Sequence, residues 1–304
     1  MKRILVTGGA GFIGSHLVVE LVKLGNSVTV IDDLSNGRME NLSGVEERII
    51  FVKDDISKPF ELRFEDYDII YHLACYPRSL SFDNPRRDVE VNVIGTLNVL
   101  ELAKRNGAKI IFPSNSGIYD TSKMLIDETS PDNPKTPYDL DKLQAENYLK
   151  LYKETYGTKY VIFRLATVYG PRQRTSLMWK PVVMEFITKL MLGKAPTIYG
   201  DGKQTRDFIH VRDVVKALIL AMYSDRAEGE TMVLGTGRET SINELYGLIS
   251  KLMGVSIPPN YAPERVGEIR RMRYDSRKAQ NLLGWKAEVS LEEGIAEILR
   301  YLGR

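Results

Sequence analysis

The chain opens with an apolar stretch that runs directly into a glycine-rich turn. Residues 4–14 read Ile-Leu-Val-Thr-Gly-Gly-Ala-Gly-Phe-Ile-Gly, so Gly9, Gly11 and Gly14 form the pattern Gly-x-Gly-x-x-Gly. In this pattern the glycines allow a tight turn, close approach of a phosphate to the backbone, and close packing of a helix on a strand. Backbone N–H groups at the helix start then face an anion. The sequence predicts a dinucleotide-binding turn between a buried strand and the first helix.

A second apolar run, residues 27–32, ends in a carboxylate, Asp32, at about the ~20-residue spacing at which an acid holds the ribose diol of a dinucleotide. A carboxylate accepts hydrogen bonds from the 2′- and 3′-hydroxyls and repels a 2′-phosphate, which favours NAD over NADP. Arg38 follows a few residues later and has the chemistry to bind a 2′-phosphate, so NADP stays open.

Composition and charge restrict the remaining function classes. The chain has 304 residues, 43% of them apolar, which is enough for a large core. The formal net charge of +2 gives no electrostatic reason to expect nucleic acid or a membrane as the partner. No long apolar segment or leader pattern is present, so we expect a cytoplasmic protein. Cys75 is the only cysteine and the three histidines are scattered, so we expect neither a disulfide nor a bound metal.

Short apolar runs alternate with amphipathic segments through the first half of the chain. This alternation predicts an α/β fold, a doubly wound parallel (Rossmann) sheet covered on both faces. We expect a cofactor domain over residues 1–166 and a smaller C-terminal α/β substrate lobe over residues 167–304, with residues 207–222 able to return to the first domain. The expected strands are 4–7, 27–32, 49–52, 69–73, 109–114 and 160–165.

Tyr138 and Lys142 are four residues apart at the predicted start of a helix, so both side chains project from one face. A phenol has a pKa near ~10 and is a weak base at neutral pH. A neighbouring ammonium favours the phenolate and lowers that pKa toward the working range. We therefore expect Tyr138 to transfer a proton and Lys142 to assist it.

Taken with the glycine turn, this pair gives the chain a resemblance to the extended short-chain dehydrogenase/reductase family, the NAD-dependent nucleotide-sugar epimerases and dehydratases. The resemblance runs from Met1 to the C-terminal region. Further matching segments are 54–56, 72–74, 169–174, 200–202, 206–211, 265–268 and 283–285.

The resemblance implies positions for both ligands. It places NAD on Gly8, Gly11, Phe12, Ile13, Gly14, Asp32, Asp33, Asn36, Gly37, Asp55, Ile56, Leu73, Ala74, Asn92, Tyr138 and Lys142. It places a UDP-sugar on Arg206, Arg265, Glu268, Thr167 and Arg174, with the diphosphate on the first two arginines. It also implies a homodimer through a four-helix bundle formed by residues 89–105 and 138–156.

The implied reaction is 4-epimerisation of a UDP-hexose of the glucose/galactose type through a transient 4-keto sugar. Asn115 occupies the position that usually carries a catalytic Ser or Thr, and an amide cannot relay a proton as a hydroxyl can. Two alternatives remain open: a UDP-glucuronate/UDP-galacturonate 4-epimerase that reads the sugar carboxylate through Arg174, and a catalytically impaired NAD-binding sensor or structural protein.

Overall fold

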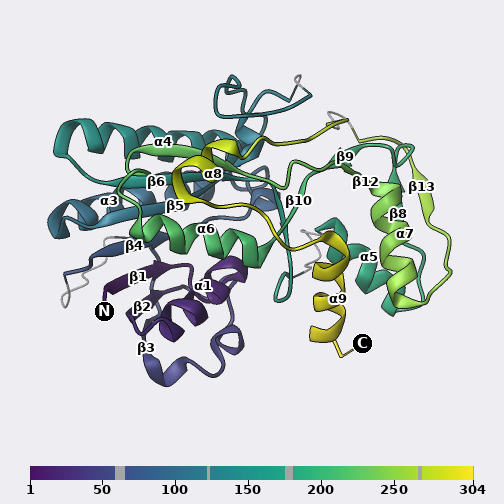
Figure 1. Cartoon of the computed structure of the whole chain (residues 1–304), viewed down its shortest axis with the longest axis horizontal. Helices are drawn as coiled ribbons and strands as arrows, with labels where there is room; N and C mark the ends of the chain where they lie inside the picture. The colour runs from purple at the N-terminus through teal and green to yellow at the C-terminus, as the bar shows by residue number, and fades with distance from the viewer. Residues whose placement is uncertain (59–65, 122–123, 175–180, 266–268, 304) are drawn as a thin grey trace.

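A seven-stranded parallel sheet forms the centre of the molecule in this computed structural model (Figure 1). The strand order is β3-β2-β1-β4-β5-β6-β11, and every neighbouring pair is parallel. The strands are β1 (Arg3–Thr7), β2 (Ser27–Ile31), β3 (Ile49–Val52), β4 (Ile69–His72), β5 (Lys109–Asn115), β6 (Tyr160–Leu165) and β11 (Glu230–Leu234). The structure describes residues 1–58, 66–121, 124–174, 181–265 and 269–303.

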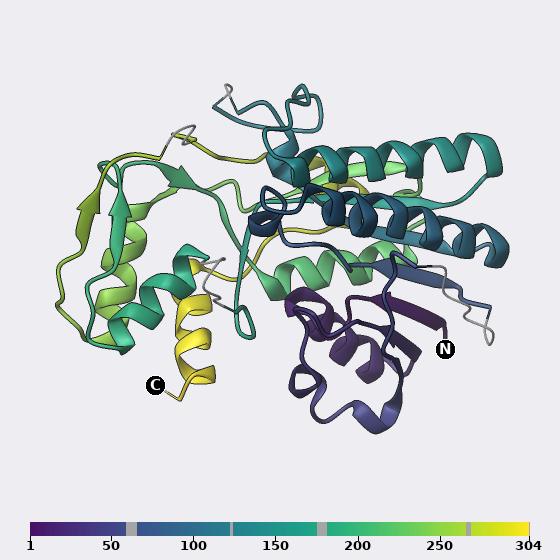
Figure 2. The ribbon, with the colours of Figure 1, turned by 180° about the vertical axis from the view of Figure 1, so that it is seen from behind.

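The order 3-2-1-4-5-6 is that of a doubly wound dinucleotide-binding sheet, which confirms the predicted fold class. Side chains alternate across it: Ile4 and Val6 enter one buried core, and Leu5 enters the other. Helices α1 and α6 pack together on the first face, whereas α3 and α4 cover the second (Figure 2). Burial on both faces explains why the strands read as continuous apolar runs.

The two segments predicted to be helical, 89–105 and 138–156, are helical in the structure. The amphipathic stretch near residues 89–105 is divided into α2, a π-helical segment (Glu90–Ile94) and α3. The α-helices are α1 (Phe12–Lys23), α2 (Pro85–Val89), α3 (Gly95–Asn106), α4 (Pro137–Tyr156), α5 (Val182–Met191), α6 (Val211–Tyr223), α7 (Ile242–Met253), α8 (Arg277–Leu283) and α9 (Leu291–Tyr301).

A smaller lobe lies beside the sheet and has its own apolar core, built mainly from α5, α7 and α9 (Figure 1). Three two-stranded sheets accompany it: β7 (Thr167–Tyr169) with β10 (Phe208–His210), β8 (Thr197–Tyr199) with β13 (Asn260–Ala262), and β9 (Thr205–Arg206) with β12 (Thr240–Ser241). Helix α6 and strand β11 come from the second half of the chain but join the large sheet and its cover. Strand β11 was not among the predicted strands.

No helix within the described residues is long and apolar enough to cross a membrane. The described residues also contain no cluster of three or more His, Cys, Asp or Glu arranged to hold a metal ion.

Candidate active site

Glycines shape the turn between β1 and α1, where the sequence predicts the dinucleotide. Gly8 has a φ of +70°, and a Cβ there would lie 2.6 Å from the backbone N of Ala74. A Cβ on Gly14 would lie 2.2 Å from the carbonyl oxygen of Gly8. Gly11 begins α1 without a side-chain cap, and the first turn of this helix contains no acidic residue. The first amides of α1, including those of Phe12 and Ile13, therefore form an anion-binding end with a positive dipole.

The carboxylate of Asp32 lies beside this turn and is held by the backbone. Oδ2 accepts from the N–H of Ala10 at 2.9 Å, and Oδ1 accepts from the N–H of Leu34 at 2.9 Å. A Cβ on Gly37 would lie 2.7 Å from Oδ1. Burial raises the pKa of Asp32 above its usual value. Each oxygen retains a lone pair for a hydroxyl, so the residue fits a ribose diol and the turn fits NAD.

The loop after β2 joins the cofactor side of the site to the lobe. Asp33 accepts from the backbone N–H and the hydroxyl of Ser35, at 2.8 and 2.6 Å, and so shapes the loop. Nη1 of Arg174 donates to the backbone carbonyl oxygen of the exposed Asn36 at 3.0 Å. Arg174 therefore lies against the loop that follows Asp32, on the cofactor side.

Asp55 and Ile56, predicted to contact adenine, hold the loop after β3. The carboxylate of Asp55 accepts from the guanidinium of Arg87 at 2.6 Å and from the backbone N–H of Ser57 at 2.9 Å. Ile56 is buried against Gly95, where a Cβ would lie 2.7 Å from the Ile56 Cδ1. Both residues are thus fixed before any ligand binds.

A hydrogen-bonded chain fixes the end of β4. His72 lies between the hydroxyls of Thr7 and Thr96, at 2.8 and 3.0 Å, and burial lowers its pKa to about 3, which keeps the ring neutral. The backbone N–H of Ala74 donates to the hydroxyl of Thr7 at 3.2 Å, after Leu73 in the same loop. Asn92 accepts from the N–H of Tyr76 at 2.9 Å and holds the loop from the helical side.

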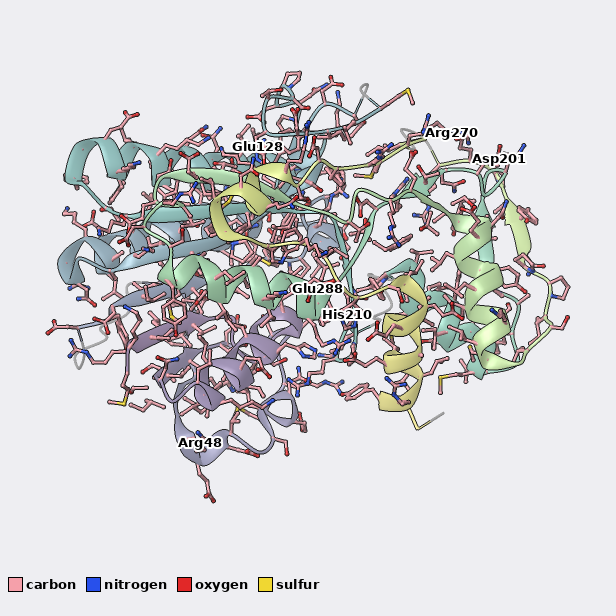
Figure 3. The ribbon with its side chains drawn as sticks, viewed as in Figure 1. Arg48, Glu128, Asp201, His210, Arg270 and Glu288 are labelled. Atoms are coloured by element: carbon pink, nitrogen blue, oxygen red, sulfur yellow. The ribbon has the colours of Figure 1, made fainter. Side chains whose placement is uncertain are left out.

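The other two histidines have structural partners. His16 Nε2 lies 3.0 Å from the carbonyl oxygen of Pro171. His210, labelled in Figure 3 beside the start of α6, accepts from the N–H of Arg212 at 3.3 Å. Burial lowers both pKa values, to about 4 and about 3.

Tyr138 and Lys142 lie in the first turns of α4, beside the carboxyl end of β5. Lys142 is buried; its Nζ donates to the carbonyl oxygen of Pro113 at 2.8 Å and lies 3.7 Å from the ring centroid of Phe112. Burial lowers the pKa of Lys142 to about 8. Burial, with the thiol of Cys75 as the next cause, raises the pKa of Tyr138 well above 10. This direction is opposite to the predicted one, because burial and the neighbouring Cys75, Asp139 and Asp88 set it, while the ammonium of Lys142 donates to a backbone carbonyl.

Asn115 ends β5 with both parts of its amide engaged. Its Oδ1 accepts from the N–H of Gly117 at 3.0 Å, and its Nδ2 donates to Oδ1 of Asp139. The other Asp139 oxygen pairs with Arg78 at 3.1 Å. Ser114 donates instead to the buried Glu146 at 2.5 Å, so it does not take the place of a catalytic hydroxyl.

Asp139 was absent from the sequence-based prediction. Its direct position after Tyr138, in the first turn of a helix, was the available indication. Its partner Arg78 lies 61 residues earlier in the chain, and no pattern in the sequence connects the two.

The predicted substrate residues lie on the lobe side. Nη1 of Arg206 donates to the carbonyl oxygens of Ile269 and Thr205, at 2.7 and 2.8 Å. The exposed Arg265 places its guanidinium 4.0 Å from the ring centroid of Tyr199. Thr167 begins β7, which pairs with β10 directly after Arg206. Glu268 lies outside the described residues. Further along this lobe, Arg270 pairs with Asp201 at 3.1 Å (Figure 3).

Comparisons with known proteins agree with this geometry. The model of the family described as GDP-mannose 4,6 dehydratase matches residues 5–298. The UDP-glucose 4-epimerase of Mycolicibacterium smegmatis is 38% identical over 309 residues, which cover 98% of each chain. The crystal structure of a Thermotoga maritima UDP-glucose 4-epimerase with UDP-glucose is 37% identical and covers 99% of this chain and 98% of its own, with a TM-score of 0.93.

A third similar structure is the UDP-glucuronic acid 4-epimerase of Bacillus cereus in complex with UDP-glucuronic acid and NAD. It is 30% identical, covers 99% of each chain and has a TM-score of 0.88. Sequence, fold and family model thus agree, and the resemblance stated from the motifs is confirmed. The chain belongs to the GDP-mannose 4,6-dehydratase family, within the extended short-chain dehydrogenases/reductases.

Proposed function

We propose that the protein is an NAD-dependent 4-epimerase that acts on a UDP-hexose of the glucose/galactose type. The observation that carries the proposal is the position of Tyr138 and Lys142 at the start of α4, beside β5, in the parallel sheet whose strand β1 leads into the glycine turn. The similar proteins from Mycolicibacterium smegmatis and Thermotoga maritima, both UDP-glucose 4-epimerases, support the same class of substrate.

The residues present fit NAD. The first amides of α1 would hold its diphosphate, and Asp32 would hold its adenosine ribose. When bound, NAD supplies reversible hydride acceptance at carbon 4 of the sugar. The loops that carry Asp33, Asn36 and Asp55, and the π-helical segment that carries Asn92, would surround it.

Tyr138 exchanges the proton of the sugar 4-hydroxyl in this proposal. As the phenolate it would take that proton during oxidation at carbon 4, and as the resulting phenol it would return the proton to the ketone oxygen during reduction, so the proton is conserved over the cycle. To accept a proton, the phenol needs positive charge nearby, and Lys142 is one helical turn away on the same face. Asn115 would donate a hydrogen bond to the same oxygen. The 4-keto sugar must turn over within the site before it is reduced on its other face.

Arg206 and Arg265 would bind the diphosphate of the substrate. Each guanidinium presents several donors in a planar fork that matches phosphate oxygens. Arg265 is exposed and its ring contact with Tyr199 leaves the N–H groups available. Thr167, Glu268 and Arg174 complete the proposed substrate set. The position of Arg174 beside Asn36 favours a neutral sugar over a uronate, because the guanidinium already has a partner on the cofactor side.

The test is to incubate the purified protein separately with UDP-glucose, UDP-N-acetylglucosamine and UDP-glucuronate, without added NAD, and to look for each 4-epimer by NMR. Epimerisation of UDP-glucose supports the proposal. Product from UDP-glucuronate alone would favour a UDP-glucuronate/UDP-galacturonate 4-epimerase instead. NAD binding without turnover of any sugar would favour a sensor or structural protein. Tyr138→Phe is the matched control, because it removes only the phenolic hydroxyl.

The proposed division of labour places NAD on residues 1–166 and the substrate on residues 167–304, with residues 207–222 returning to the first domain through α6, which packs on α1 and β5. We place the enzyme in the cytoplasm.

We also propose a homodimer through a four-helix bundle. Helix α4 and the α2–α3 segment lie side by side and expose Val89, Ile94, Leu140 and Leu151 (Figure 2). An apolar surface of this kind suits a two-fold interface. Light scattering after size exclusion should give twice the mass of one chain, and Leu140→Glu should give the monomer.

A further inference from the structure

The amide of Asn115 has only one orientation that satisfies its neighbours. The N–H of Gly117 is a donor, so it requires Oδ1 opposite it, and this bond measures 3.0 Å. The carboxylate of Asp139, paired with Arg78 at 3.1 Å, is an acceptor, so it requires Nδ2. A flipped amide would set oxygen against oxygen and N–H against N–H. The two neighbours together therefore fix which end of the amide faces which way.

Asp139 is itself firmly held. Its side chain is fully buried, directly after Tyr138 in the first turn of α4, where the helix dipole favours negative charge. Its backbone N–H donates to the hydroxyl of Thr136 at 3.1 Å. A buried carboxylate is costly unless it is paired and hydrogen-bonded, and Arg78 and Asn115 meet that requirement here.

Gly117 provides the space for this arrangement. A Cβ at this position would lie 2.8 Å from Nδ2 of Asn115 and 2.9 Å from Oδ1 of Asp139. Its backbone does not have a positive φ, so the conformation of the chain there does not call for glycine. The absence of a side chain at residue 117 is therefore explained by the close approach of the amide to the carboxylate.

We propose that Asp139 is a positioning residue that, with Gly117 and Arg78, makes Asn115 a fixed hydrogen-bond donor to the reacting sugar hydroxyl. Asp139 takes one hydrogen of Nδ2, and the other is offered to the substrate oxygen. A rotating hydroxyl at residue 115 could both donate and accept, whereas this amide nitrogen only donates. Proton transfer then falls to Tyr138 alone. This inference rests on the proposed epimerase function and deepens it.

The kinetic test compares Gly117→Ala in two backgrounds. In the wild-type background the added methyl group separates Asn115 from Asp139, and we expect kcat to fall about tenfold or more while KM for the UDP-sugar changes less than about twofold. In an Asn115→Ser background the amide is absent and only the 2.9 Å contact with Oδ1 of Asp139 remains, so the same substitution should change kcat less than about threefold. An equal loss in both backgrounds would overturn the inference.

A second readout does not depend on activity. In perdeuterated, 15N-labelled protein, the two side-chain N–H signals of Asn115 are identified by their loss in Asn115→Ser. They should lie far apart in the wild type, because only one hydrogen is bound to a carboxylate, and should converge in Asp139→Asn and in Gly117→Ala. Signals that stay in place in both variants would contradict the inference.

Asp213→Asn is the matched control. Asp213 is also a buried acid at the third position of a helix, and its carboxylate accepts from the N–H groups of Glu288 and Val289 at 3.1 Å, away from the site. It should alter stability without moving the Asn115 signals. If wild-type protein turned over no UDP-sugar, the proposed function would fail, while the NMR result would still decide whether Asp139 orients Asn115.

Discussion

The two sides of the site are built in different ways. On the cofactor side, the backbone makes the site: a Cβ on Gly14 would meet a carbonyl oxygen at 2.2 Å, and two backbone N–H groups hold Asp32. On the lobe side, long side chains make it: Arg206 binds carbonyl oxygens and Arg265 stacks on Tyr199. The first side tolerates little change, whereas the second can change its ligand by exchanging side chains. One scaffold can therefore keep its cofactor while its substrate varies.

The largest effect should come from the group that acts between the two sides. Tyr138→Phe removes the hydroxyl that we propose to transfer the proton and leaves both binding surfaces in place, so we expect turnover to fall by roughly 10²–10⁴-fold. Affinity for the UDP-sugar, measured by calorimetry, should stay within about threefold. Unchanged turnover in this variant would remove Tyr138 from the mechanism.

Gly14→Ala tests the rigidity of the cofactor side. The added Cβ would meet the Gly8 carbonyl, so we expect a loss of about 2–4 kcal/mol in the free energy of unfolding and purification without bound NAD. Gly247→Ala in α7 is the matched control, because nothing lies within 4 Å of its Cβ and its φ is not positive. There the same change should stabilise the protein by about 0.5–1 kcal/mol. If denaturant titrations gave the same change in the free energy of unfolding for Gly14→Ala and Gly247→Ala, the cofactor side would not be the more rigid one.

Arg265→Ala tests the side-chain character of the lobe side. Loss of a charged hydrogen bond costs about 1.5–3 kcal/mol, so KM for the UDP-sugar should rise about 10–100-fold, with a smaller change in the melting temperature than Gly14→Ala causes. Arg300→Ala, an exposed arginine at the end of α9, is the control and should leave KM unchanged. A KM equal to the control's would exclude Arg265 from substrate binding.

The smallest expected effect is a pH dependence of stability that differs between the two sides. Burial and the neighbouring Asp141, with Asp139 further off, raise the pKa of Asp88 to about 7, and its Oδ1 accepts from Asn92 at 2.5 Å. The folded protein then binds a proton that the unfolded chain releases near pH ~4, so this contribution to stability is lost as pH rises through about 7.

Asp88→Asn should make the fall of the melting temperature between about pH 4.5 and 8 shallower, while the contribution of the buried Asp32, whose pKa is also raised, should remain. On the lobe side, Arg270 lowers the pKa of the exposed Asp201. A lowered pKa reduces stability as pH falls, which is the opposite of the effect of Asp88, and it does so only at more acidic pH. Arg270→Gln should therefore leave the slope in place. If the melting temperature of Asp88→Asn changed with pH as steeply as that of the wild type, the pH dependence would belong to another carboxyl group.

Local patterns predicted the strand, glycine turn and helix at the start of the chain, because these residues are close in sequence and their backbone demands are visible as glycines, whereas the residues assigned to NAD stay a prediction. The six predicted strands are present for the same reason. Strand β11 was missed because its five residues become a strand by pairing with β6, and that pairing is a tertiary event. The pKa of Tyr138 was predicted in the wrong direction, because spacing shows which groups are near but not how deeply they are buried. The role of Asp139 could not be predicted, because its partner Arg78 lies far away in the chain.

The position of β11 also has a consequence for synthesis of the protein. The sheet that holds the cofactor is completed at one edge by residues 230–234, about three-quarters of the way along the chain. Until they leave the ribosome, β6 presents an unpaired edge whose residues are mostly apolar, which is the kind of surface that pairs with other chains. Contacts of such long sequence separation slow folding. The nascent chain thus depends on its own late segment, or on a chaperone, for protection of that edge.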